Sequence, residues 1–285
     1  MRYKTVGLIL LLVMATSART RALSIPECKN LEGSKKALAE KILSSQYPYD
    51  CCDSSIAQCL KNEKVCSLAW RLARNICRRV ANGQDEKKIL RSLSRRARSM
   101  MQGGRTFTID TDSSPRLGPP DAKVTVVEYA CARCPFCSKI SPVIYEAVAN
   151  GPLKNKVKLV FKTFPLKSHE HSKEAGLAFI ASARLGKFWE FMRYSYAHFD
   201  SFCPKLQTKW AEAVGMDKDD FEKLLKDPDV RKQLVDNVKE AIRNKVEATP
   251  TFFINNRRYA GDLDTDELQD VFEEEYDRVT GRKFR

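Results

Sequence analysis

Two kinds of hydrophobic periodicity divide the chain into a helical part and a mixed part. Between residues 65 and 80 apolar side chains recur every three or four positions, and Asn82–Gly83 ends the pattern. A second such stretch, residues 85–101, begins with acidic residues, which favour a helix N-terminus. Both stretches therefore predict helices with one buried face. The first stripe consists of Val65, Leu68, Ala69, Leu72, Ile76 and Val80.

The pattern after residue 121 alternates between strands and helices. Short runs rich in β-branched residues predict strands, and longer mixed runs predict helices. The pair Asn255–Asn256 is a hairpin-turn signal between two of the strands. In order, we expect a strand over 122–130, a helix over 138–150 bent at Pro142, a strand over 155–164, helices across about 168–246, two strands around the Asn pair, and a helix starting near Asp264. This order predicts an α/β unit.

A linker separates the two parts, and a targeting segment precedes them. Gly and Pro pairs within residues 100–123 place the boundary near Gly103–Gly104. The basic start, the short apolar run and the small residues near Ala18 or Ala22 are typical of a cleaved secretory signal, with an uncleaved anchor as the alternative. The predicted divisions are a signal peptide (1–22), a Cys-rich basic helical domain (23–103) and a larger domain (104–285). We expect a periplasmic or otherwise extracytoplasmic protein with no stable membrane span after cleavage.

The net charge of +14 is concentrated in the helical domain. Residues 23–103 hold 16 basic and 8 acidic side chains, whereas residues 104–285 hold 30 and 28. Such a basic unit could dock an acidic partner, approach anionic lipid or cap the rest of the chain. Nucleic-acid binding is not expected of an exported protein, and we expect Arg95, Arg96 and Arg98 to form a solvated helix face.

The ten cysteines fit an exported protein, since disulfides persist outside the cytosol. On one helix Cys66 and Cys77 would lie ~16 Å apart, whereas a disulfide needs its Cα atoms within about 7 Å. Each must therefore bond another segment, and adjacent Cys51 and Cys52 are poor partners. We expect three bridges, with the pairing left open. The helical domain holds Cys28, Cys51, Cys52, Cys59, Cys66 and Cys77, and the larger domain holds Cys131, Cys134, Cys137 and Cys203.

The motif Cys134-Pro135-Phe136-Cys137 falls where a strand is expected to end and a helix to begin. Helix N-termini carry free N–H groups and partial positive charge, which stabilise a thiolate and make Cys134 nucleophilic. Helical spacing brings Cys137 to the same face, where it can resolve a mixed disulfide. Pro135 suits the first helical turn, and we expect Pro135 and Phe136 to face the substrate. Since the cysteine pair carries the two electrons, no cofactor is expected.

Four segments together resemble the DsbA-like branch of the thioredoxin superfamily: "VEYACARCPFC", "FKTFPLKSHEHSKEAGLA", "GKFWEFM" and "VEATPTFFINNRRYAG". The resemblance extends over about 105–285, and it implies a thioredoxin-like fold with a helical insertion at about 168–246. The predicted fold class is therefore α/β, with a small all-α disulfide-stapled domain before the thioredoxin-like part. That small domain is weakly similar to the helical domain of cytochrome c maturation thiol proteins, but it lacks their CxxC, so no active site is carried over.

The resemblance also implies roles for three residues outside the motif. Pro250 would follow a cis peptide bond and face the CxxC, and the backbone of Thr249 would pair with an extended substrate peptide. Glu128, six residues before Cys134, would be the acidic residue beneath the site and accept the proton of Cys137. The alternative for Glu128 is an ordinary strand residue facing solvent.

Other residues near the motif leave alternatives open. Cys131 is an accessory redox thiol, a partner for Cys203, or a buried unreactive cysteine. Phe164 and Pro165 are expected to add to a peptide-facing apolar surface. The cysteine spacing approaches that of an iron–sulfur run, but Ser141 stands at the fourth position, and the three histidines lack zinc-ligand spacing. We therefore expect no metal.

These features predict an exported thiol:disulfide oxidoreductase that oxidises or exchanges disulfides in extracytoplasmic proteins. The alternatives are a thiol reductase for cytochrome c maturation, a disulfide isomerase, and a non-catalytic, chaperone-like binding protein. The expected partners are unfolded or cysteine-containing exported proteins and a membrane redox partner, either a quinone-linked oxidase or a thiol reductant donor. The direction of electron flow depends on the redox potential, which a sequence does not give.

Overall fold

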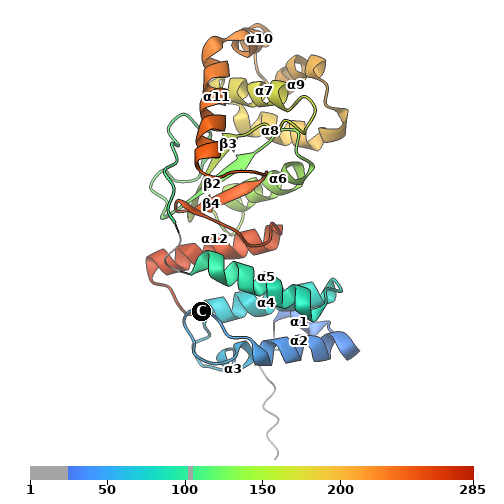
Figure 1. The fold of residues 1–285 in the computed structure, drawn as a ribbon, viewed down its shortest axis with the longest axis vertical. Helices are drawn as coiled ribbons and strands as arrows, with labels where there is room; N and C mark the ends of the chain where they lie inside the picture. Colours follow the sequence, from blue (N-terminus) through green and yellow to red (C-terminus); the bar gives the residue numbers. More distant parts are fainter. Residues whose placement is uncertain (1–24, 102–104) are drawn as a thin grey trace, which may run out of the picture.

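The computed structural model describes residues 25–101 and 105–285. The predicted signal peptide lies outside the described residues, and the predicted boundary at 103–104 falls between the two described ranges. Within these ranges, none of the helices combines the length and apolarity needed to cross a bilayer. Figure 1 shows a helical part followed along the sequence by a part built on a sheet.

The first part is all-helical. Its helices are α1 (Pro26–Lys29), α2 (Gly33–Ser45), α3 (Ile56–Cys59), α4 (Ser67–Ala81) and α5 (Glu86–Met100). Asp85 caps α5 by accepting a hydrogen bond from the Lys88 N–H. The predicted apolar stripe is buried in the core of this part, except for Val65, which lies before α4 and is half-buried. The predicted elements of this region are therefore present.

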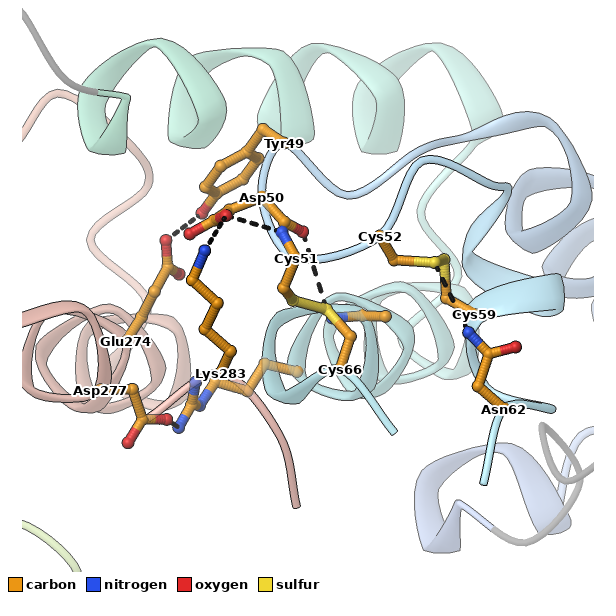
Figure 2. Close-up of a disulfide and its surroundings, with 12 residues drawn as sticks. Tyr49, Asp50, Cys51, Cys52, Cys59, Asn62, Cys66, Glu274, Asp277 and Lys283 are labelled. Carbon is orange, nitrogen blue, oxygen red and sulfur yellow. Dashed lines mark hydrogen bonds and ion pairs between the residues drawn. A yellow bond between two sulfur atoms is a disulfide. The ribbon is translucent and has the colours of Figure 1, made fainter. Parts of the chain in front are cut away.

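Three disulfides hold the helical part together: Cys28–Cys77, Cys51–Cys66 and Cys52–Cys59. Figure 2 shows the last two, with Cys51 next to Asp50 in the loop that precedes α3. Cys66 is the N-cap of α4, so it lies at the opposite end of the helix from Cys77. The geometric exclusion of a Cys66–Cys77 bond is correct, and each of the two reaches a different segment.

The second part is a five-stranded sheet in the order β1-β3-β2-β4-β5. Strands β2 and β3 are parallel, and the other neighbours are antiparallel. The strands are β1 (Arg116–Leu117), β2 (Val124–Ala130), β3 (Val157–Thr163), β4 (Thr251–Ile254) and β5 (Arg257–Arg258). Asn255 and Asn256 both have positive φ, at 45° and 63°, as the tight turn between β4 and β5 requires.

Helices cover both faces of the sheet. One face packs on α6 (Pro135–Ala149) and α12 (Thr265–Thr280), through a core that includes Val126, Ile144 and Phe272. The other face packs on α11 (Pro228–Arg243), through residues such as Val127. The insertion also contains α7 (Ser172–Arg184), α8 (Phe188–Ala197), two 3-10 turns (Phe199–Ser201 and Pro204–Leu206), α9 (Gln207–Ala213) and α10 (Lys218–Lys226). The predicted α/β fold class with a helical insertion is confirmed.

The two parts meet along α12, which lies between the sheet and helices α4 and α5 (Figure 1). Arginines of α4 and α5 pair with carboxylates on or just before α12. The pairs are Arg71–Asp277 (2.5 Å), Arg74–Asp270 (3.7 Å), Arg78–Asp264 (2.8 Å), Arg79–Glu267 (2.7 Å), Arg96–Glu274 (2.8 Å) and Arg95–Asp262. The helical part therefore packs as a cap on the rest of the chain, and its predicted roles toward an acidic partner or anionic lipid stay predictions.

The C-terminal residues reinforce this contact. The Ser67 N–H donates to the Lys283 carbonyl at 3.0 Å, and the Arg285 N–H donates to the Val65 carbonyl at 2.9 Å. The Arg285 guanidinium also lies 3.8 Å from the centre of the Trp70 ring. The chain thus returns to the N-terminal end of α4 after α12.

Two expectations are wrong. Arg96 does not lie on a solvated face, because its side chain is fully buried against α12. Strand β1 lies in the segment that was expected to be a linker. Its two residues pair with Leu159 and Val160 of β3, but they show no apolar pattern that would have predicted a strand.

Candidate functional site

The CxxC motif occupies the junction between β2 and α6. β2 ends at Ala130, and α6 has Cys134 as its N-cap and Pro135 as its first residue. The Cys134 N–H donates to the Cys131 carbonyl at 3.0 Å. Pro135 fits the first position of the helix, because an N–H at that position would have no partner within the helix. Cys134 therefore stands at the positive end of the α6 dipole.

Cys134 and Cys137 are free thiols with opposite pKa shifts. A hydrogen bond from Cys137 is the main reason that the pKa of Cys134 falls to about 5, with help from the Thr249 side chain and the Phe136 N–H and against the effect of burial. Burial is the main reason that the pKa of Cys137 rises well above its usual value, and the charges of Glu128 and Cys134 add to the rise. The lowered pKa favours the thiolate form of Cys134, whereas the raised pKa keeps the proton on Cys137.

The loop that leads into β4 lies against this pair. The Thr249–Pro250 peptide bond is cis, and the Cys134 thiol donates to the Thr249 carbonyl at 3.3 Å. The structure therefore brings the Cys134 sulfur next to the backbone of Thr249, although 115 residues separate them.

Glu128 is fully buried beneath the motif. Its carboxylate accepts a hydrogen bond from the Ser141 hydroxyl of α6, and its second oxygen has no hydrogen-bond partner among the described residues. Burial raises the pKa of Glu128 to about 8, although the Ser141 hydrogen bond lowers it. The solvent-facing alternative for Glu128 is wrong, and the carboxyl can change protonation near neutral pH.

Comparison with known families identifies the sheet-containing part. A family model described as Thioredoxin matches residues 110–274, which is more than half of the chain. The chain belongs to the thioredoxin family. This region includes β2, the CxxC, the helical insertion and the cis-proline loop.

Two solved structures share the fold of this part of the chain. BdbD from Bacillus subtilis is 22% identical, with a TM-score of 0.54, and the match covers 61% of this chain and 99% of BdbD. The α-DsbA1 of Wolbachia pipientis is 20% identical, with a TM-score of 0.53, and the match covers 61% and 96%. The predicted DsbA-like fold within the thioredoxin superfamily is confirmed.

The curated relatives with similar sequences carry a different name. A Na(+)/H(+) antiporter NhaA of Salinispora tropica is 32% identical over 181 residues, which are 61% of this chain and 27% of the antiporter. An NhaA of Mycolicibacterium gilvum is 32% identical over 168 residues, or 56% of this chain and 26% of the antiporter. The chain thus spans about a quarter of the length of these relatives.

Two further cysteines of this thioredoxin-family chain lie near the site. Cys131 is buried, which is the main reason that its pKa is raised, and Cys203 is half-buried. Both are free, so the alternative in which they bond each other is not observed. The Cys131 sulfur instead lies 3.4 Å from Nδ1 of His169, a contact that the sequence did not indicate. The described residues contain no cluster of three or more potential metal ligands.

Arg133, between Cys131 and Cys134, was not singled out from the sequence. Its guanidinium lies 4.4 Å from the ring centre of Phe199 and 4.6 Å from that of Phe202, and it donates to the Phe199 carbonyl at 2.6 Å. These contacts fasten the loop before the CxxC to the helical insertion. The only signal in the sequence is a basic residue directly before the motif.

The apolar surface beside the motif is narrower than expected. Phe136 is 66% exposed, the highest value among the large hydrophobic side chains described, whereas Cys134 is 1% exposed. Phe164 is buried in the core beside the sheet, so the expectation that it faces a peptide is wrong. Phe136 therefore offers an exposed apolar ring close to Cys134, which is itself nearly covered.

Proposed function

We propose that this protein is an extracytoplasmic thiol:disulfide oxidoreductase with Cys134 and Cys137 as its redox pair. The observation that best supports this proposal is the pKa of Cys134, which is lowered to about 5 at a helix N-terminus beside a cis-proline loop. A thiolate is the attacking species in disulfide exchange, and a thiol of low pKa also leaves readily. The three disulfides of the helical part support an oxidising compartment.

The favoured direction is oxidation of client thiols. A client thiolate attacks the sulfur of Cys134 in the Cys134–Cys137 disulfide, and Cys137 leaves as a thiolate that takes up a proton. A second client thiolate then attacks the client sulfur of the mixed disulfide, which releases Cys134 and forms the client disulfide. Because a low pKa stabilises the reduced pair, it favours this direction. A membrane redox partner would remove the two electrons.

Four residues would assist this exchange. Glu128, with its pKa raised to about 8, would give a proton to Cys137 as it leaves and take it back when the pair is reoxidised. Thr249 and Pro250 would hold an extended client beside Cys134, and the exposed ring of Phe136 would contact it. The transport activity named for the NhaA relatives is not proposed here, because the match covers about a quarter of those proteins.

The reduction potential tests the proposal. The protein is equilibrated with glutathione buffers, and the reduced fraction of the Cys134–Cys137 pair is measured by alkylation and mass spectrometry. A potential near the DsbA end, about −120 mV, supports an oxidase, whereas one near about −270 mV overturns that direction and favours a reductase.

The variant Cys134→Ser separates catalysis from binding. Oxidative refolding of a reduced client and insulin reduction should both be lost in this variant, while Cys203→Ser should keep them. If Cys134→Ser still assists refolding as well as the parent protein does, the chain is a binding protein and not an enzyme.

A further inference from the structure

A basic cleft lies at the edge of the interface between the helical part and the sheet. It has a volume of about 420 Å³, and the end of α5, residues 105–107 and strand β5 line it. None of its lining residues belongs to the site around Cys134. The side chains that matter here are Arg95, Arg98, Arg105, Arg257 and Arg258, with Phe107 beside them.

Among the described residues, two of the five arginines pair with carboxylates. Arg95 pairs with Asp262, and Arg257 pairs with Glu275 at 2.8 Å. The remaining three contact only neutral groups within the described residues, so they leave an uncompensated positive charge in the cleft.

The contacts of these three arginines leave donors available. Arg98 donates to the Ser94 hydroxyl, Arg258 donates to the Lys245 carbonyl, and Arg105 stacks on the Phe107 ring at 5.2 Å. A guanidinium carries five N–H groups in a rigid fork, so one such contact leaves most of them free.

The positive surface continues from this cleft along α5. A neighbouring cleft of about 340 Å³ shares Arg95 and is otherwise lined by Asp85, Lys87, Lys88 and Arg91. Elsewhere on the contact face of α4 and α5, the arginines meet the carboxylates of α12. In the cleft this pairing is incomplete, because Arg98, Arg105 and Arg258 have no carboxylate partner among the described residues.

We propose that this cleft binds a phosphate-bearing anion. Guanidinium groups pair with phosphate through parallel N–H···O bonds, and a tetrahedral phosphate offers acceptor oxygens in several directions. Arg98, Arg105 and Arg258 line the cleft from three separate segments, so a phosphate group bound there would lie among positive charges from several directions. The phosphate comes either from a soluble phosphate compound or from the headgroup of an anionic phospholipid.

Two probes distinguish these sources. Inorganic pyrophosphate is titrated into the full chain by calorimetry at low ionic strength, and co-sedimentation is measured with phosphatidylglycerol vesicles against phosphatidylcholine vesicles. The test variant is R98A/R105A/R258A. The control R116A/R231A/R243A removes the same charge from arginines that have no ion pair among the described residues. Circular dichroism and thermal melting establish that both variants are folded.

We expect saturable binding that weakens at least tenfold in the test variant and less than twofold in the control. If this holds for pyrophosphate, the ligand is a soluble phosphate compound; if it holds only for phosphatidylglycerol vesicles, the ligand is a lipid headgroup. The variant R98K/R105K/R258K keeps the positive charge but loses the planar guanidinium donors, and it should also bind the phosphate probe several-fold more weakly. The absence of binding to both probes, or equal loss in the test and control variants, would overturn the proposal.

Discussion

The guanidinium of Arg96 donates a 2.8 Å hydrogen bond to the carboxylate of Glu274, although 178 residues separate the two. The side chain of Arg96 is fully buried, and the Tyr49 hydroxyl donates to the other oxygen of Glu274 at 2.5 Å. The pair therefore joins α5 to α12 through a fully buried guanidinium and a partly buried carboxylate. It makes the helical part a fixed component of the fold.

Removal of one member of this pair should strongly destabilise the protein. Arg96→Ala leaves the Glu274 carboxylate, whose side chain is 12% exposed, without its cation. Breaking a buried pair typically costs about 3–5 kcal/mol, and we expect a loss toward the lower end of this range. The free energy of unfolding from urea denaturation measures the effect. Arg91→Ala on the exposed side of α5 serves as the control and should change stability by less than about 0.5 kcal/mol. Equal effects for the two variants would show that the interface contributes little.

The thiol of Cys134 should titrate far below an ordinary cysteine. Its pKa is lowered to about 5, so iodoacetamide should alkylate the reduced protein with a pH midpoint near 5. In Cys137→Ala the main stabilising hydrogen bond is lost, and the midpoint should move upward. A midpoint near 9 in the parent protein would remove the basis of the proposed activity.

The carboxyl of Glu128 should make stability depend on pH. Its pKa in the folded state, about 8, lies above the ordinary value of 4.5. Between pH 4.5 and pH 8, the carboxyl is therefore protonated in the folded state and ionised in the unfolded state. Stability from this group is therefore lost as the pH rises from about 4.5 to about 8, by at most about 1.4 kcal/mol per pH unit. In the reduced protein the lowered pKa of Cys134 adds the opposite slope above about pH 5, so the test is the difference between two profiles. In urea denaturation, Glu128→Gln should gain stability relative to the parent protein as the pH rises from about 5 to about 8. Parallel profiles for the two proteins would contradict the raised pKa.

The same substitution should slow proton transfer. Glu128→Gln cannot exchange a proton with Cys137, so the reaction of the oxidised protein with a thiol peptide should slow by roughly tenfold or more. Stopped-flow fluorescence follows the reaction. Glu146→Gln, on the exposed side of α6, is the matched control, and it should react at the parent rate.

The disulfides of the helical part should differ in their contribution. Cys28–Cys77 closes a separation of 49 residues and Cys52–Cys59 one of 7. Loop-closure entropy predicts that replacing the first pair with alanine costs about 4 kcal/mol, against about 2.5 kcal/mol for the second. Thermal and urea unfolding of the two double variants give the comparison. A larger loss for the short loop would mean that packing around Cys52 outweighs chain entropy.

Local signals account for what the sequence predicted well. The strands, the helical insertion and the Asn255–Asn256 turn follow from side-chain periodicity and from backbone preferences within a few residues. The position of Cys134 at a strand-to-helix junction follows from the same signals. These features depend little on where distant parts of the chain lie.

Contacts between distant segments account for the features that the sequence did not predict. Arg96 has the spacing of the buried face of α5, in line with Leu93 and Met100. Its charge is typical of a surface residue, however, and only the carboxylate that α12 supplies allows it to be buried. The contact between Cys131 and His169, and the stacking of Arg133 on Phe199, likewise depend on how the insertion folds back over the site. Strand β1 was missed because two residues are too few for a pattern.

The carboxylates of α12 also bear on how the chain matures. The ribosome makes α4 and α5 long before α12, so the arginines of the cap emerge without their counter-charges. In the interval the cap relies on its own apolar core and its disulfides, while its positive face stays open to solvent and to any polyanion nearby. The arrival of α12 then shields that face, and maturation of the cap is completed by a helix synthesised after the whole redox site.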